Sequence, residues 1–99
     1  MNTLFRNFEK QKIDRVAFFG TGELAEIAFI SLQETGITLA GIVDGAKAGE
    51  RFLGMRVIAP EEIQTLKFQK IVVTDLESSG GAMKEILDRG IARTKIALL

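Results

Sequence analysis

The spacing of apolar residues along the chain changes several times, and each change marks the boundary of a predicted strand or helix. Four short apolar runs lack polar alternation, which is typical of strands that are buried on both faces of a sheet. They cover residues 15–19, 37–43, 70–74 and 95–99. The chain therefore contains four candidate core strands.

The segments between these runs carry helical signals. Apolar residues after Gly22 recur at the spacing of a helix that packs one face against a sheet. Pro60 opens a short helix, because proline suits the first helical position. Ser78 or Ser79 is the expected cap of a further helix over about residues 81–89.

Strands and helices thus alternate, which predicts a parallel sheet because each helix returns the chain across one face. The expected fold class is α/β: a small Rossmann-like three-layer sandwich with a mainly parallel four-strand sheet, half of a doubly wound fold. In this prediction residues 13–99 form the nucleotide-binding domain, and residues 1–12 form an N-terminal helix or a tail. Residues 46–52 are expected as a loop and residues 54–58 as a brief extended piece.

Charge and residue types narrow the range of functions. Thirteen basic and thirteen acidic residues cancel, so no overall basic field attracts nucleic acid or an anionic membrane. No apolar run reaches the roughly 18–20 residues that span a bilayer, and we expect a cytoplasmic protein. His, Cys, Tyr and Trp are absent, and histidine is the commonest acid–base group at neutral pH. The chain by itself is therefore a poor candidate for a complete enzyme.

One motif carries candidate chemistry. Residues 20–25 read Gly-Thr-Gly-Glu-Leu-Ala and fit G-x-G-x-x-A, a dinucleotide fingerprint that follows a strand and opens a helix. Gly20 permits a tight turn, Gly22 lets a pyrophosphate approach the main chain, and Ala25 allows close packing of helix and strand. The candidate cofactor-binding residues of this turn are Gly20, Thr21, Gly22, Glu23 and Leu24. The alternative is a close strand–helix turn that binds no ligand.

An acidic residue stands at the end of the next strand. Asp44 lies 22 positions after Gly22, near the spacing of about 20 at which a carboxylate accepts hydrogen bonds from an adenosine ribose. Its charge repels a 2′-phosphate, although Lys47 and Arg51 lie nearby and weaken that effect. The expected cofactor is therefore NAD, ahead of NADP and CoA. Alternatively, the Asp-Gly pair only forms a turn.

Other candidate residues carry weaker signals. Thr74 and Asp75 end the third strand at the same edge as the glycine turn, so they either line a ligand crevice or cap the following turn. Residues 78–81 form either a second anion-binding turn or a flexible loop. Phe5 and Phe8 are expected to make a core contact or a homodimer contact.

These features together resemble a known group of modules. The stretches GTGELAEIA, IVD and FLGMRVIAPEEI resemble the N-terminal nucleotide-binding modules of nucleotide-sugar dehydratases of the polysaccharide-biosynthesis type. They are also similar to the N-terminal domains of bacterial sugar O-acyltransferases, and similar modules occur beside winged-helix domains in bacterial regulators. The resemblance covers about residues 13–99. It implies that residues 20–24 surround phosphates and that Asp44 meets the ribose, and no residue matches the dehydratase catalytic residues.

Three functions are compatible with these sequence features. The first is a sensing or regulatory module that holds NAD(H) and reports occupancy to a partner domain or subunit. A homodimer is expected with it. The second is the cofactor-binding part of a nucleotide-sugar or sugar-modifying enzyme. The third is an interaction domain that uses the fold as a scaffold and binds no ligand.

Overall fold

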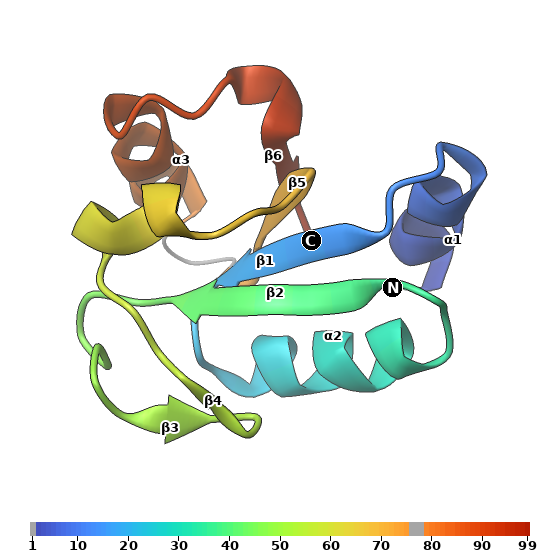
Figure 1. Cartoon of the computed structure of the whole chain (residues 1–99), viewed down its shortest axis with the longest axis horizontal. Coiled ribbons are helices and arrows are strands. Elements are labelled where there is room, and N and C mark those ends of the chain that lie inside the picture. Colours follow the sequence, from blue (N-terminus) through green and yellow to red (C-terminus); the bar gives the residue numbers. More distant parts are fainter. Residues whose placement is uncertain (1, 76–78) are drawn as a thin grey trace.

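The computed structural model describes residues 2–75 and 79–99 of the chain, and Figure 1 shows their arrangement. The elements in chain order are α1 (Asn2–Lys10), β1 (Arg15–Phe19), α2 (Glu23–Gln33), β2 (Thr38–Val43), β3 (Arg51–Phe52), β4 (Met55–Arg56), the 3₁₀ helix η1 (Pro60–Thr65), β5 (Lys70–Val73), α3 (Ser79–Asp88), the 3₁₀ helix η2 (Arg93–Lys95) and β6 (Ile96–Leu98). None of the helices described is long and apolar enough to cross a membrane.

Four strands form one parallel sheet in the order β2-β1-β5-β6. The chain leaves β1 toward β2 and later returns to the other side of β1 as β5. The carboxyl ends of β1 and β5 therefore border the point where the strand order reverses, which is where open α/β sheets bind ligands. This topology confirms the predicted α/β class and the mainly parallel four-strand sheet.

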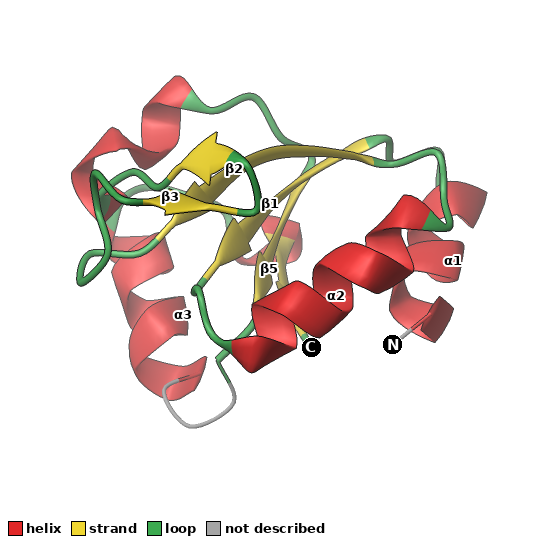
Figure 2. Ribbon diagram, turned by 90° about the horizontal axis from the view of Figure 1, so that it is seen from below, coloured by secondary structure: helices red, strands yellow, loops and turns green. Residues whose placement is uncertain are grey.

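Helices cover both faces of the sheet, as Figures 1 and 2 show. Ala28 and Leu32 of α2 belong to one buried cluster, which α1 also joins. Ile63 of η1 and Ile86 of α3 belong to a second cluster on the opposite face. Crossovers between parallel strands are right-handed as a rule. The β1–α2–β2 and β5–α3–β6 units run in opposite directions across the sheet, so their helices lie on opposite faces.

The first residues of the chain form a helix that belongs to the core. Phe5 is fully buried, and Phe8 is 4% exposed. The Phe5 ring centre lies 6.2 Å from that of Phe8 and 6.5 Å from that of Phe18 in β1. Of the two roles expected for these phenylalanines, the structure shows the core contact. Their rings lie inside this chain, where a second copy does not reach them.

A small antiparallel hairpin, β3 and β4, lies where a loop and an extended piece were expected. Leu53 and Gly54 connect its strands with φ angles of 53° and 78°, as in a type I′ turn. Phe52 and Met55 pack against the core on the α2 side of the sheet. The sequence pattern missed this hairpin because each strand has only two residues, too few for an alternation to be recognised.

The later elements differ from the prediction at their boundaries. α3 begins at Ser79 and includes Gly80 and Gly81. Ser79 is therefore a helical residue and not the cap. Ser78, the other cap expected, lies outside the described residues. Glycine disfavours a helix locally, and here the packing of α3 on the sheet overrides that preference. The last strand is Ile96–Leu98 and not the predicted 95–99, because Lys95 belongs to η2.

Replacing Phe5 by alanine is expected to destabilise the domain by about 3–5 kcal/mol, because it empties a fully buried site beside Phe8 and Phe18. Urea unfolding followed by circular dichroism measures the change. Arg6→Ala, on the exposed side of the same helix, is the control and should change stability by less than about 0.5 kcal/mol. Equal effects of the two substitutions would mean that α1 does not belong to the cooperative core.

Candidate functional site

The loops that follow β1, β2 and β5 meet at a cleft of about 580 Å³ at the carboxyl edge of the sheet. Its lining residues are Gly20, Thr21, Gly22, Glu23, Leu24, Asp44, Thr74 and Asp75. All the candidate cofactor-binding residues expected from the sequence therefore line one cleft. The parallel sheet explains this, because the carboxyl ends of its strands lie at the same edge.

Gly20 makes the sharp exit from β1. Its φ angle is 124°, which side chains rarely allow. Its N–H donates a hydrogen bond to the carbonyl oxygen of Val43 at 2.9 Å, so the pairing of β1 with β2 continues into the turn. A Cβ atom on Gly20 would lie 2.6 Å from the hydroxyl oxygen of Thr74. The protein's own structure therefore requires glycine at this position.

Gly22 differs from Gly20 in this respect. It is the N-cap residue of α2, with φ −85° and ψ −167°, an extended conformation that any residue adopts. A Cβ atom built on Gly22 would meet no atom of the described residues within 4 Å. Neither the backbone conformation nor the packing of the described residues requires glycine here. The space that its missing side chain leaves belongs to the cleft.

The start of α2 directs unpaired main-chain donors toward this space. The first N–H groups of a helix have no intrahelical acceptor, and Gly22 makes no side-chain cap. Within the described chain, the N–H groups of Gly22, Glu23 and Leu24 donate no hydrogen bond outside the helix. The carbonyl oxygen of Gly22 already accepts from Ala25 at 3.0 Å. The main chain at this end of the helix can therefore bind an anion.

Asp44 links the end of β2 to the glycine turn. Its Oδ2 atom accepts a hydrogen bond from the Thr21 hydroxyl at 2.8 Å, and its Oδ1 atom accepts one from the Ala46 N–H at 2.9 Å. The second bond is an Asx-type turn, so the turn-forming role of this residue is observed. An ionised carboxylate has about four acceptor positions. About two remain for a ligand, which matches the two hydroxyl groups of a ribose.

Thr74, directly after β5, forms hydrogen bonds to the end of β1. It is 2% exposed, and its N–H and hydroxyl donate to the carbonyl oxygen of Phe19 at 3.0 and 3.2 Å. The Thr74 hydroxyl thus contacts the main chain of the neighbouring strand β1. Asp75 is exposed at the mouth of the cleft. Thr74 therefore shapes the floor of the cleft, whereas Asp75 adds charge to its rim.

The charge of the cleft is negative. Glu23, Asp44 and Asp75 line it, and none of the lysines or arginines that the structure describes does. Lys47 and Arg51 lie in an adjoining hollow of about 230 Å³, which shares Thr21 with the cleft. The cleft therefore suits a ligand with a low net negative charge, since the three carboxylates would repel a ligand that carries many negative charges.

A second adjoining hollow, of about 320 Å³, extends the cleft toward α3. It shares Gly20, Asp44 and Asp75 with the cleft and adds Gly81 and Glu85 of α3. Gly81 belongs to residues 78–81, which the sequence marked as an anion-binding turn or a loop, and the structure places Ser79–Gly81 in α3. Sequence reasoning did not single out Glu85, because only the packing of α3 on the sheet brings it to this edge. Among the described residues, no group of three metal-ligating side chains gathers here or elsewhere.

Gly20→Ala is expected to destabilise the fold by about 1–3 kcal/mol, because alanine meets the Thr74 hydroxyl and strains the backbone at a φ of 124°. Gly22→Ala is the matched control and should leave the melting temperature nearly unchanged, since its Cβ meets no atom. Thermal unfolding measures both variants. Equal melting temperatures for the two would disprove the different roles assigned to these glycines.

The comparisons with known proteins agree with the fold described above. A solved structure with a similar fold is titled "Crystal structure of RSP, a Rex-family repressor", with 16% sequence identity and a TM-score of 0.59. The alignment covers 98% of this chain and 56% of the repressor chain, so this chain spans little more than half of the repressor's length. At that identity the likeness shows the fold alone.

The sequence comparisons identify one family. No curated protein matches the chain, so the resemblance to dehydratases and acyltransferases stays a prediction. A family model described as "C2185-like, N-terminal" matches residues 12–97. This match runs from before β1 into β6, and it includes the glycine turn, Asp44 and the end of β5. The chain therefore belongs to the C2185-like N-terminal family.

Proposed function

We propose that this chain is a nucleotide-binding module that holds NAD(H) in the cleft and serves a sensing or regulatory role without catalytic residues of its own. The observation that carries this proposal is the space at Gly22. The protein's own packing does not require glycine there. A ligand that approaches the main chain closely would require it.

The diphosphate of the dinucleotide occupies this space in our proposal. The N–H groups of Gly22, Glu23 and Leu24 supply hydrogen-bond donors, and the start of α2 supplies a partial positive charge. Among the described residues that line the cleft, no side chain is cationic, so main-chain groups carry this interaction. Main-chain donors suit a diphosphate that carries two charges better than a ligand with several more.

The adenosine ribose lies at Asp44 in this arrangement. The carboxylate is already held by Thr21 and Ala46, so its free acceptor positions are oriented before a ligand arrives. A 2′-phosphate would meet the same negative charge, which favours NAD over NADP. Lys47 and Arg51 in the adjoining hollow would attract a 2′-phosphate and oppose this preference. A competition experiment between NAD and NADP measures which effect is larger.

A regulatory role fits the chemistry of the site better than a catalytic one. The cleft offers three carboxylates and two hydroxyl groups, and the chain has no histidine or cysteine. The cleft joins the ends of three strands and the start of α2, so a bound dinucleotide would tie these segments together. A repressor with a similar fold supports the regulatory reading. The partner that receives this signal is a separate domain or subunit in our proposal.

Gly22→Val is expected to abolish NAD binding while the fold stays intact, because its branched side chain fills the space proposed for the diphosphate. Its extended backbone accepts valine without strain. Isothermal titration calorimetry measures the affinity, and circular dichroism checks the fold.

Gly36→Val is the matched control for this substitution. A Cβ atom on Gly36 also meets no protein atom within 4 Å, and this residue does not line the cleft. The control should bind NAD as the parent chain does. Unchanged affinity in Gly22→Val would refute the diphosphate position, and no binding by the parent chain would favour a scaffold without a ligand.

Asp44→Ala is expected to weaken NAD binding about tenfold or more, because charge-assisted hydrogen bonds are worth roughly 1.5–3 kcal/mol. The alanine also removes the bonds to Thr21 and Ala46. Asp44→Asn is the matched variant, since its amide oxygen can still accept from Ala46 while the charge is lost.

The asparagine variant should also narrow the preference for NAD over NADP, because it no longer repels a 2′-phosphate. Competition calorimetry with both cofactors measures this preference. Tighter binding of NADP than of NAD by the parent chain would contradict the ribose role of Asp44, whatever the result for Gly22→Val.

A further inference from the structure

An apolar ridge with acidic neighbours runs along the outer side of α2. Ile27 is 49% exposed and Ile30 is 65% exposed, and they lie one helical turn apart. Glu26 and Glu34 lie four positions on either side of Ile30 and are also exposed. No lysine or arginine occurs in α2. These four residues are called the acidic ridge below.

The exposure of the two isoleucines sets α2 apart from an ordinary surface helix. A helix that covers a sheet usually has one apolar face and one polar face. α2 buries Ala25, Ala28 and Leu32 toward the sheet, and the isoleucines lie on the side away from it. Water thus contacts two branched apolar side chains whose burial would be favourable.

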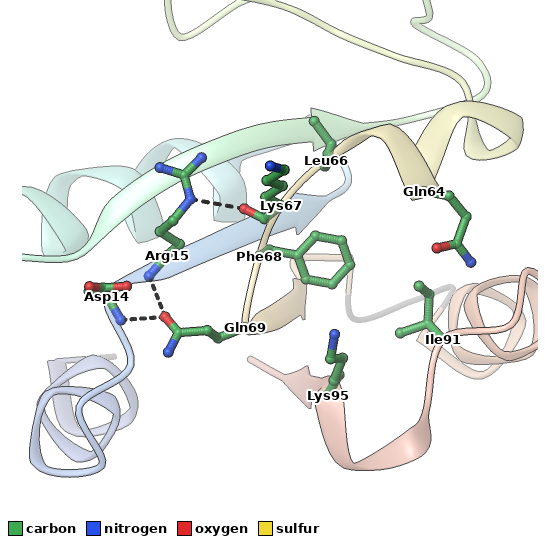
Figure 3. A pocket seen from close by; sticks show the side chains of 9 residues that line it. All are labelled: Asp14, Arg15, Gln64, Leu66, Lys67, Phe68, Gln69, Ile91 and Lys95. Carbon is green, nitrogen blue, oxygen red and sulfur yellow. Dashed lines mark hydrogen bonds between the residues drawn. The ribbon is translucent and has the colours of Figure 1, made fainter.

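A hollow of about 300 Å³ with the opposite charge lies at the amino edge of the sheet, away from the nucleotide cleft (Figure 3). Cations from three segments surround it: Arg15 of β1, Lys67 before β5 and Lys95 of η2. Asp14 is the one carboxylate among its lining residues. We call this feature the basic hollow.

Apolar side chains also line the basic hollow. Leu66, Phe68 and Ile91 contribute to it, and Figure 3 shows the Phe68 ring among the lining side chains. The Lys95 ammonium group lies 5.6 Å from the centre of this ring. The Arg15 Nε atom donates to the carbonyl oxygen of Lys67 at 3.0 Å. This bond holds the guanidinium group beside the hollow while the rest of its donors stay at the exposed surface.

The acidic ridge and the basic hollow are complementary, since each combines apolar side chains with charges that are mainly of one sign: glutamates on the ridge, and three cations against one carboxylate in the hollow. They cannot meet within one chain. α2 packs on one face of the sheet, whereas Leu66, Phe68 and Ile91 belong to the cluster on the other face. In Figure 1, α2 and η1 lie on opposite sides of the sheet.

We propose that the acidic ridge of one copy of this chain docks into the basic hollow of a second copy. The contact covers the exposed isoleucines and sets Glu26 and Glu34 against cations. A symmetric contact between two ridges would set glutamates against glutamates, and one between two hollows would set cations against cations. Charge therefore selects the head-to-tail arrangement among the three.

This arrangement has consequences for assembly. Each copy keeps a free ridge or a free hollow after one contact, so head-to-tail docking builds a closed ring or an open row of copies. The surfaces are small, and interfaces that bury less than about 1,200 Å² in total are weak or transient. The association therefore increases with protein concentration and decreases with added salt, which screens exposed charges. The association of copies does not require a bound nucleotide.

Sedimentation of the full chain tests the proposal. The average mass in solution should rise as the protein concentration approaches about 1 mM, a range in which weak contacts form. Raising the salt from about 0.05 M to about 0.5 M should lower it. A chain that stays monomeric over this range would overturn the proposal.

Two variants separate the surfaces. Ile30→Lys removes the apolar contact and adds a cation, and the helix tolerates it because Glu26 and Glu34 flank the lysine at i±4. Lys67→Glu reverses a charge of the basic hollow at an exposed side chain. Each variant alone should remain monomeric. Their mixture should form a one-to-one dimer, because one variant keeps an intact hollow and the other an intact ridge.

A matched mixture controls for simple attraction between oppositely charged proteins. Ile30→Lys combined with Lys47→Glu has a net negative charge but keeps a blocked ridge, so it should not bind the single Ile30→Lys variant. Lys47 lies outside both surfaces. Failure of the first mixture to dimerise, or dimerisation of the control mixture, would refute head-to-tail docking. Self-association of both single variants at the parent's strength would place the contact elsewhere.

Discussion

The organisation of this molecule depends on the close approach of the end of β1 to the end of β5. The carbonyl oxygen of Phe19 accepts two hydrogen bonds from Thr74, at 3.0 and 3.2 Å. Gly20 follows at once and has no side chain where the Thr74 hydroxyl lies. Its N–H pairs in turn with Val43 of β2. One turn therefore joins the three strands β2, β1 and β5 and directs the chain into α2.

The same turn determines the chemistry that the cleft offers. The donors at its base are main-chain N–H groups at the start of α2, whereas the side chains of Glu23, Asp44 and Asp75 are acidic. The proposed binding of a dinucleotide depends on this combination of main-chain donors and acidic side chains. The two glycines differ, because packing and backbone conformation require glycine at Gly20, whereas a side chain at Gly22 would project into the open cleft.

A net charge of zero conceals a marked separation of charge over the surface. The cleft at the carboxyl edge and the acidic ridge carry carboxylates, and the basic hollow carries three cations at the other edge of the sheet. Composition excludes a strong overall field, but it says nothing about local complementarity. The same applies to apolar residues: Phe5 is buried within the chain, whereas Ile30 is exposed.

Local signals in the sequence were sufficient for the element types and for the residues of the cleft. Apolar runs without alternation indicate buried strands, and parallel strands place their following loops at one edge. That reasoning was enough to bring Gly20, Asp44 and Thr74 together. It failed for the hairpin β3–β4 and for the start of α3, where short length or tertiary packing outweighs local preference.

The sequence by itself determined the four core strands, the glycine turn and the place of Asp44, because each depends on neighbouring residues and their spacing. Only the tertiary structure decided the strand order, which sets Thr74 against Phe19 across 55 positions of the chain. It alone decided that Phe5 faces the core and that a side chain at Gly22 would meet open space. The physical reason is that contacts between distant segments depend on how whole strands and helices pack, and no short stretch of sequence encodes that.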